Sequence, residues 1–115
     1  MRVIRIVPNL RMNSNEASRG FYAGFLGLDV GMDMEWIVTF VSAANPTAQL
    51  STLTEDATAP IVPNVTVEVD DIDGLYAEAL QRGLAVIYPL TTEPWGVRRF
   101  FVQDPGGNVI NCMMH

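Results

Sequence analysis

Residues 93–112 read EPWGVRRFFVQDPGGNVINC, and the turn in the middle of this stretch decides the fold of the C-terminal part of the chain. In the DPGG segment at 104–107, proline restricts φ at one turn position and glycine tolerates the positive φ that a tight turn requires. The apolar runs at 98–103 and 108–113 therefore predict two strands joined as a hairpin. With the Pro-Trp-Gly turn that precedes them, these strands form a frame suited to holding a ligand.

Upstream of this hairpin, the sequence predicts another strand followed by a helix. Apolar and polar residues alternate over 65–69, as in a half-buried strand. The acids at 70–73 supply an N-cap and a charged first turn, and Gly83 is placed to end the helix. The apolar stripe of this helix consists of Leu75, Tyr76, Ala79 and Leu80. A short strand at 85–88 comes next.

The first half of the chain repeats this order. VPNLRM at 7–12 recurs as VPNVTV at 62–67, and the helical stretches GFYAGFLGL and GLYAEALQRGL follow. Ser14 or Asn15 can cap the first helix and Gly27 can end it. The strands expected after it are 36–42 and 49–53, with an Asn-Pro-Thr turn at 45–47. We predict an α+β fold in which two βαβββ modules, about 1–56 and 61–115, make up a single domain, 1–115.

Composition limits the classes of function. The chain has 115 residues, 49% of them hydrophobic, and a formal net charge of −6. A chain of this size buries one compact core, and its acidic balance disfavours binding to nucleic acid. No long apolar run suggests a membrane span or an export signal, and Cys112 is the only cysteine. We expect a cytoplasmic protein without disulfides.

Three motifs resemble those of the glyoxalase, bleomycin-resistance and extradiol-dioxygenase superfamily, also called the vicinal oxygen chelate superfamily. They are FYAGFLGLDV, VEVDDIDGLYAEALQRG and RRFFVQDPGGNVI, in this order along the chain. VPNL, IVPN and EPWG look most like the bleomycin-resistance proteins of that superfamily. The resemblance implies curved mixed sheets around a cleft, a homodimer, and binding of a cationic antibiotic that the protein does not alter.

The resemblance also raises the question of a metal, because many superfamily members place His or Glu on the strands that line the cleft. At the matching positions this chain has Asn64, Gln49 and Asn111, and the strand at 7–9 carries no histidine. Neutral amides are poor substitutes for the imidazole and carboxylate ligands of zinc or iron. The only histidine, His115, is the last residue. We predict no metal and no cofactor.

Two tryptophans provide further candidates for ligand contact. Trp36 is placed on a strand with Val38 and Phe40, where it fills the core or lines the cleft, and Trp95 lies in a turn, where its flat ring favours ligand contact. Nearby acids, Asp33, Glu35 and Glu93, favour a cationic guest. One of Arg98 and Arg99 is expected to face the cleft. The predicted ligand-binding set is Trp36, Phe40, Gln49, Asn64, Trp95, Arg98, Asn111 and Met113.

The function predicted from the sequence is metal-independent binding and sequestration of a small, cationic, aromatic molecule such as a bleomycin-type antibiotic, with no nucleic acid or membrane partner. The alternative is a metal-free or divergent enzyme of the superfamily, a lyase or isomerase with Glu68 as its general base, since Glu68 shares a strand face with Asn64 and Thr66. A third possibility is a member that serves only as an interaction module.

Overall fold

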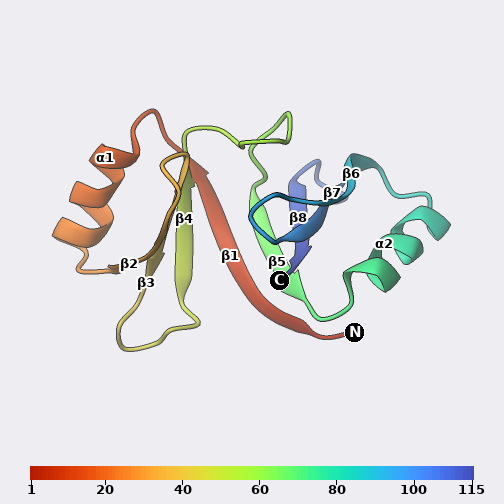
Figure 1. Cartoon of the computed structure of the whole chain (residues 1–115), viewed down its shortest axis with the longest axis horizontal. Coiled ribbons are helices and arrows are strands. Elements are labelled where there is room, and N and C mark those ends of the chain that lie inside the picture. The colour runs from red at the N-terminus through yellow and green to blue at the C-terminus, as the bar shows by residue number, and fades with distance from the viewer. The chain divides into compact units, whose positions relative to one another are not determined.

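The computed structural model describes all residues, 1–115, and their contacts divide the chain into two compact units. Unit 1 consists of Met1–Ile6 and Pro63–His115, and unit 2 consists of Val7–Val62. The long strand β1 (Val3–Arg11), red in Figure 1, contributes its first residues to unit 1 and its remaining residues to unit 2. Each unit therefore depends on part of the same strand.

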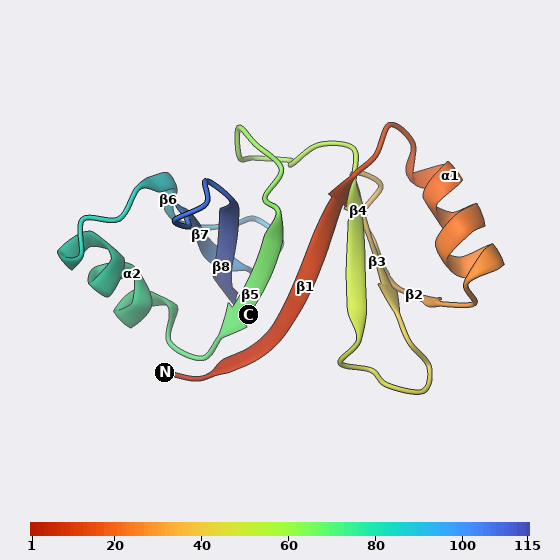
Figure 2. The same ribbon diagram turned by 180° about the vertical axis from the view of Figure 1, so that it is seen from behind.

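In unit 2, β1 is followed by a short helix, a π-helical segment and three strands. The elements are α1 (Asn15–Ser18), η1 (Arg19–Phe25), β2 (Asp29–Asp33), β3 (Ile37–Val41) and β4 (Gln49–Leu53). The strand order is β2-β3-β4-β1, antiparallel except for the parallel pair of β1 and β4. The helical segment lies beside these strands in both views (Figures 1 and 2).

In unit 1, the order is strand, helix and three strands. The elements after the first residues of β1 are β5 (Val65–Val69), α2 (Ile72–Gln81), β6 (Val86–Thr92), β7 (Arg98–Gln103) and β8 (Val109–Met114). The strand order is β1-β5-β8-β7-β6. Just before β1, the backbone N–H of Arg2 donates to Asp70 Oδ1 (2.7 Å), and the Arg2 carbonyl accepts from the Asp70 N–H (3.2 Å).

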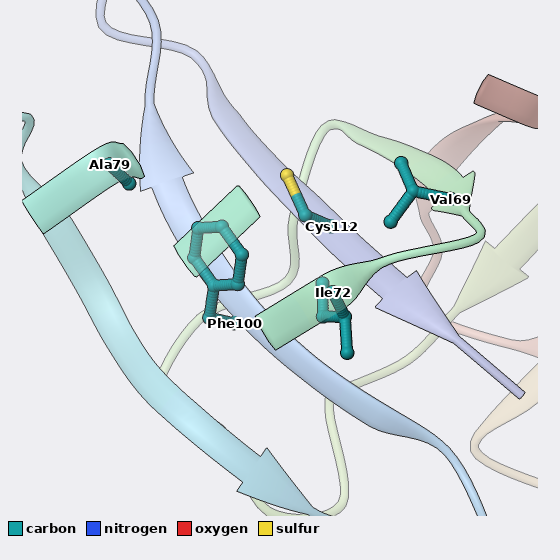
Figure 3. Packing of buried hydrophobic residues seen from close by; sticks show 5 residues of the cluster. All are labelled: Val69, Ile72, Ala79, Phe100 and Cys112. Atoms are coloured by element: carbon teal, nitrogen blue, oxygen red, sulfur yellow. The ribbon is translucent and has the colours of Figure 1, made fainter. Parts of the chain in front are cut away.

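The core of unit 1 lies between α2 and one face of its strands. Val69, Ile72, Ala79, Phe100 and Cys112, from β5, α2, β7 and β8, form a buried cluster (Figure 3). Tyr76 of α2 adds an edge-to-face ring contact with Phe100, with 4.9 Å between centroids. Because strand side chains alternate, the residues between these positions point away from α2. That opposite face carries the polar groups described below.

The structure confirms the α+β fold with two βαβββ-like modules. The caps are also confirmed: Ser14 Oγ accepts from the Ala17 N–H (3.2 Å), and Asp71 Oδ1 accepts from the Gly74 N–H (3.0 Å). At the C-terminal hairpin, Asp104 Oδ1 accepts backbone N–H bonds from Gly106 and Asn108, and Gly107 has a φ of 85°.

Four details of the secondary structure differ from the sequence prediction. Strand β2 was not predicted because its DVGMD segment is wholly exposed and contains a glycine. The first helix widens into π-helical turns, where the Leu26 N–H donates to the Phe21 carbonyl. Trp36 precedes β3 instead of lying on it. Strand β6 runs past Tyr88 to Thr92 despite Pro89, which an edge strand tolerates.

Candidate functional site

The candidate site is the face of β5, β7 and β8 that points away from α2, which we call the polar face. Register fixes its members: Thr66 lies opposite Asn111 and Glu68 opposite Met113, while Phe101 and Arg99 lie next to the same two residues on β7. The polar face thus consists of Thr66, Glu68, Arg99, Phe101, Asn111 and Met113. Each polar member is a half-buried or buried side chain, so its hydrogen bonds matter for stability.

Asn111 occupies the centre of the polar face and is only 7% exposed. Its Nδ2 donates to Thr66 Oγ1 at 3.1 Å. Its Oδ1 is buried and accepts no hydrogen bond, and it is the one side-chain atom in the structure of which this is true. A buried acceptor left without a donor costs about 1–3 kcal/mol, so this atom is a natural place for a ligand donor.

Glu68 lies diagonally across from Asn111 on the polar face. Its Oε1 accepts from Arg5 Nε at 3.0 Å, and its side chain is 16% exposed. His115 Nε2 lies 3.9 Å from its Oε2, which is too far for a hydrogen bond. The Glu68 carboxylate therefore already has a cationic partner, Arg5, within the protein.

Arg99 forms a second ion pair at the β7 end of the polar face. Its Nε and Nη2 donate to Glu93 Oε2 at 2.8 and 2.7 Å, and the two side chains are 5% and 2% exposed. The guanidinium carbon lies 4.9–5.5 Å from the ring centroids of Phe101, Trp95 and Tyr88. The Trp95 ring therefore already contacts a cation of the protein itself, the Arg99 guanidinium, which also balances the charge of Glu93.

Of the predicted ligand residues, five lie in unit 1 and three in unit 2. Within unit 1, Asn111 and Met113 share the polar face, and Trp95 lies against Arg99. Asn64 precedes β5, and its Oδ1 accepts from the Val109 N–H at 2.8 Å. Arg98 lies on the other side of the strand, where its Nη2 donates to Asp73 of α2 at 2.9 Å and holds the pKa of that carboxyl below its usual value. Of the two arginines, Arg99 is therefore the one on the polar face.

Within unit 2, the three predicted residues do not share one face. Phe40 is fully buried on the helix side, 5.3 Å from the Tyr22 ring, so it is a core residue. Gln49 lies on the opposite face with Ser51, and its Nε2 donates to the Pro46 carbonyl at 2.9 Å. Trp36 is half-buried at the start of β3. Asp33, one of the expected attractants for a cation, pairs with Arg19 and has a lowered pKa, first because of the Glu35 N–H and then because of Arg19.

Strand register also changes which first-half residue corresponds to Asn111 among the positions where superfamily members hold a metal. Asn9 lies opposite Ser51 and Arg11 opposite Leu53, whereas Asn64 is bonded to Val109 and Thr66 lies opposite Asn111. When the VPN repeats are superposed in sequence, the first-half counterpart of Asn111 is therefore Leu53, and not Gln49.

The donor set does not fit the zinc or iron that the superfamily resemblance would imply. The four corresponding positions hold three neutral amides, Asn9, Asn64 and Asn111, and one leucine. The side-chain oxygen of Asn64 is already used by a backbone N–H. No group of three or more His, Cys, Asp or Glu side chains is arranged to hold a metal ion.

Three members of this arrangement were not among the sequence candidates. Arg5 meets Glu68 across 63 positions of sequence, and no local pattern signals that pair. Phe101 and Tyr88 contribute ring faces to the Arg99 cluster, and the alternation along β7 was the one signal that pointed to the Phe101 side of the strand.

Several solved structures share this fold. A Legionella pneumophila structure described as an NAD-dependent benzaldehyde dehydrogenase has a TM-score of 0.77 at 15% identity, covering 95% of this chain and 97% of that one. A glyoxalase/bleomycin resistance protein/dioxygenase superfamily member from Vibrio splendidus has a TM-score of 0.71 at 22% identity, covering 96% and 98%. Streptomyces coelicolor methylmalonyl-CoA epimerase has a TM-score of 0.71 at 16% identity, covering 98% of both chains.

At such identities these likenesses establish the fold alone. No curated protein matches the sequence. No helix of the structure combines the length and the apolar character needed to cross a membrane. The family model for the Glyoxalase/Bleomycin resistance protein/Dioxygenase superfamily, however, matches residues 4–112. The chain therefore belongs to the glyoxalase/bleomycin resistance protein/dioxygenase superfamily.

Proposed function

We propose that this protein binds a small organic molecule on the polar face of unit 1, without a metal ion, and sequesters it without turnover. The observation that carries the proposal is the buried Oδ1 of Asn111, which has no donor within the protein. It stands where the superfamily's carboxylate would lie on the last strand. A ligand N–H or O–H placed there recovers the cost of about 1–3 kcal/mol that the unpaired acceptor imposes.

The balance between binding and catalysis rests on Glu68. A general base must be able to take a proton from the substrate, and Glu68 already shares its charge with Arg5 at 3.0 Å. Glu93, the other acid near this face, is likewise held in an ion pair, with Arg99. Sequestration needs only complementary hydrogen bonds and apolar contacts, which Asn111, Met113 and Phe101 offer.

Some of the sequence arguments for a cationic, aromatic ligand of the bleomycin type still hold, and others are weaker. The net charge of −6 attracts cations at long range. Glu93 and Asp33 contribute less than the sequence suggested, because each is paired with an arginine. Selection for a cation must then come from the acceptors of the polar face. The homodimer also remains a proposal, and sedimentation velocity at several concentrations tests it.

The test is calorimetric titration of chelator-treated protein with bleomycin and with a panel of smaller cationic aromatic compounds, followed also by tryptophan fluorescence. Saturable binding that is lost in Asn111→Leu supports the proposal. Gln81→Ala, which removes an exposed amide at the end of α2, is the matched control and should bind as the wild type does. Binding that appears only after zinc, iron or manganese is added, or conversion of a bound compound, would contradict the proposal.

Stability provides an independent readout for the same variant. Asn111→Leu removes an unpaired buried acceptor, which stabilises, and also the hydrogen bond to Thr66 Oγ1, which destabilises, so the free energy of unfolding should stay within about 1 kcal/mol of wild type. Loss of binding together with nearly unchanged stability separates a lost contact from a misfolded protein. A variant that binds normally would show that Asn111 is not part of the site.

A further inference from the structure

We infer that Glu68 selects the ligand by charge, as the counter-ion of a protonated nitrogen whose N–H group also donates to Asn111. This inference rests on the proposed function and adds to it the chemical class of the ligand group. Glu68 is then a specificity residue and not a general base. The evidence is a pair of neighbouring acceptor oxygens on the polar face that receive no hydrogen bond within the protein.

The first acceptor is Asn111 Oδ1, which is buried without a partner. The second is Glu68 Oε2. The hydrogen bond that Glu68 accepts goes to its other oxygen, Oε1, from Arg5 Nε, and His115 Nε2 lies 3.9 Å from Oε2. Two acceptors without donors favour a ligand that brings several N–H groups.

Strand register places the two acceptors next to each other. Thr66 lies opposite Asn111, and Glu68, two residues later on the same face of β5, lies opposite Met113. Glu68 is thus the diagonal neighbour of Asn111 on the same face of the parallel pair of β5 and β8. An amidinium group carries N–H donors on two nitrogens and so has a donor for each of the two oxygens.

The arrangement of Arg5 is compatible with this role. Arg5 Nε donates to Glu68 Oε1 at 3.0 Å, and Oε2 is the oxygen that a ligand N–H can reach. The pair is partly exposed, with side-chain exposures of 24% and 16%, so Oε2 remains open to a second cation. An anionic ligand group would instead bring acceptor oxygens to Glu68 Oε2 and Asn111 Oδ1, which have no proton to donate.

The experiment compares benzamidine, benzyl alcohol and benzoate, which share a ring and differ in charge and donor capacity. Binding is followed by nitrogen-edited NMR of the chelator-treated protein. We expect benzamidine to bind most tightly, benzyl alcohol less tightly and benzoate least, with chemical-shift changes at Asn111 and Glu68. Glu68→Gln should weaken benzamidine about tenfold, the value of one charge-assisted bond, and leave benzyl alcohol nearly unchanged.

Two further variants complete the test. Glu78→Gln removes the same charge from an exposed, arginine-paired glutamate on α2 and should leave all three affinities unchanged. Asn111→Leu should weaken both benzamidine and benzyl alcohol. If Asn111→Leu has no effect on any compound that binds, the proposed site itself is wrong.

The role of Glu68 can fail on its own, if Asn111→Leu weakens binding but the affinities do not follow the charge of the ligands. Tighter binding of benzoate than of benzamidine would mean that the Asn111 amide presents its N–H groups to the ligand. An unchanged benzamidine affinity in Glu68→Gln, or no benzamidine shifts on the polar face, would likewise overturn the role of Glu68 as counter-ion.

Discussion

Removing the cation of the buried Arg99–Glu93 pair, as in Arg99→Met, should destabilise the protein strongly. The two side chains are 5% and 2% exposed, so the Glu93 carboxylate would be left without its guanidinium in a site that water hardly reaches. Breaking a buried pair from one side costs about 3–5 kcal/mol. The Tyr88 hydroxyl, 3.2 Å from Glu93 Oε1, compensates for only a small part of that cost.

Cation–π contacts add to the expected loss. The guanidinium carbon of Arg99 lies 5.2 Å from the centroid of the Trp95 ring, an interaction of about 0.5–2 kcal/mol. Urea unfolding followed by circular dichroism gives the free energy of unfolding, and the tryptophan emission of the native state should change at the same time. Glu93→Gln, which keeps the shape and leaves Arg99 with a neutral acceptor, serves as the companion single variant.

A double-mutant cycle decides whether the pair itself is responsible. We expect Arg99→Met and Glu93→Gln together to cost clearly less than the sum of the two, with a coupling energy above about 1 kcal/mol. Additive losses, or a loss below about 1 kcal/mol in Arg99→Met, would refute the view that this pair is a buried ionic bond. Arg98→Met, which removes a half-exposed arginine paired with Asp73, is the matched control and should cost about 0–1 kcal/mol.

Three further predictions concern stability. Burial raises the pKa of the Cys112 thiol from 9.0 to about 11. The native state therefore favours the protonated thiol, and the stability that this protonation contributes is complete below pH 9 and is lost as the pH rises to about 11. The free energy of unfolding of Cys112→Val should depend less on pH between 9 and 11 than that of wild type, and equal dependence would contradict the shift. Asp71→Ala should cost about 1 kcal/mol in urea unfolding, because α2 loses its N-cap bond to Gly74, and an unchanged midpoint would show that the cap is dispensable. Gly107→Ala should cost about 1 kcal/mol at its φ of 85°, and a neutral result would mean that the hairpin turn adapts.

The sequence predicted the elements whose signals are local. The strands at 98–103 and 49–53 were predicted with the bounds that the structure shows, and the cap at Asp71 and the turn at Asp104 are matters of short-range hydrogen bonding. Strand β2 lacks such signals: it has no buried residue, so no alternation marks it. Its pairing with β3 is a tertiary property.

The candidate site was less accessible from sequence, because it depends on which face each residue takes. Alternation showed that Arg98 and Arg99 must point in opposite directions, but only the position of α2 decides which of them meets Asp73. Phe40 matched the aromatic pattern of a ligand residue, and the ring of Tyr22 makes it a core residue instead. The unpartnered Oδ1 of Asn111 has no sequence signature, since it results from the absence of a donor among all its neighbours.

The division of β1 between the two units has a consequence for how the chain can be cut. A fragment that begins at Pro63 would lack Met1–Ile6, and the edge of β5 that faces β1 would be left unsatisfied. An uncovered edge of this kind recruits foreign strands, so such a fragment is expected to aggregate. A synthetic peptide with the sequence of residues 1–6, added to this fragment, should pair with β5 in place of the missing strand and reduce the aggregation. The repeat visible in the sequence is therefore not a pair of separable modules, because the second one borrows its outer strand from the opposite end of the polypeptide.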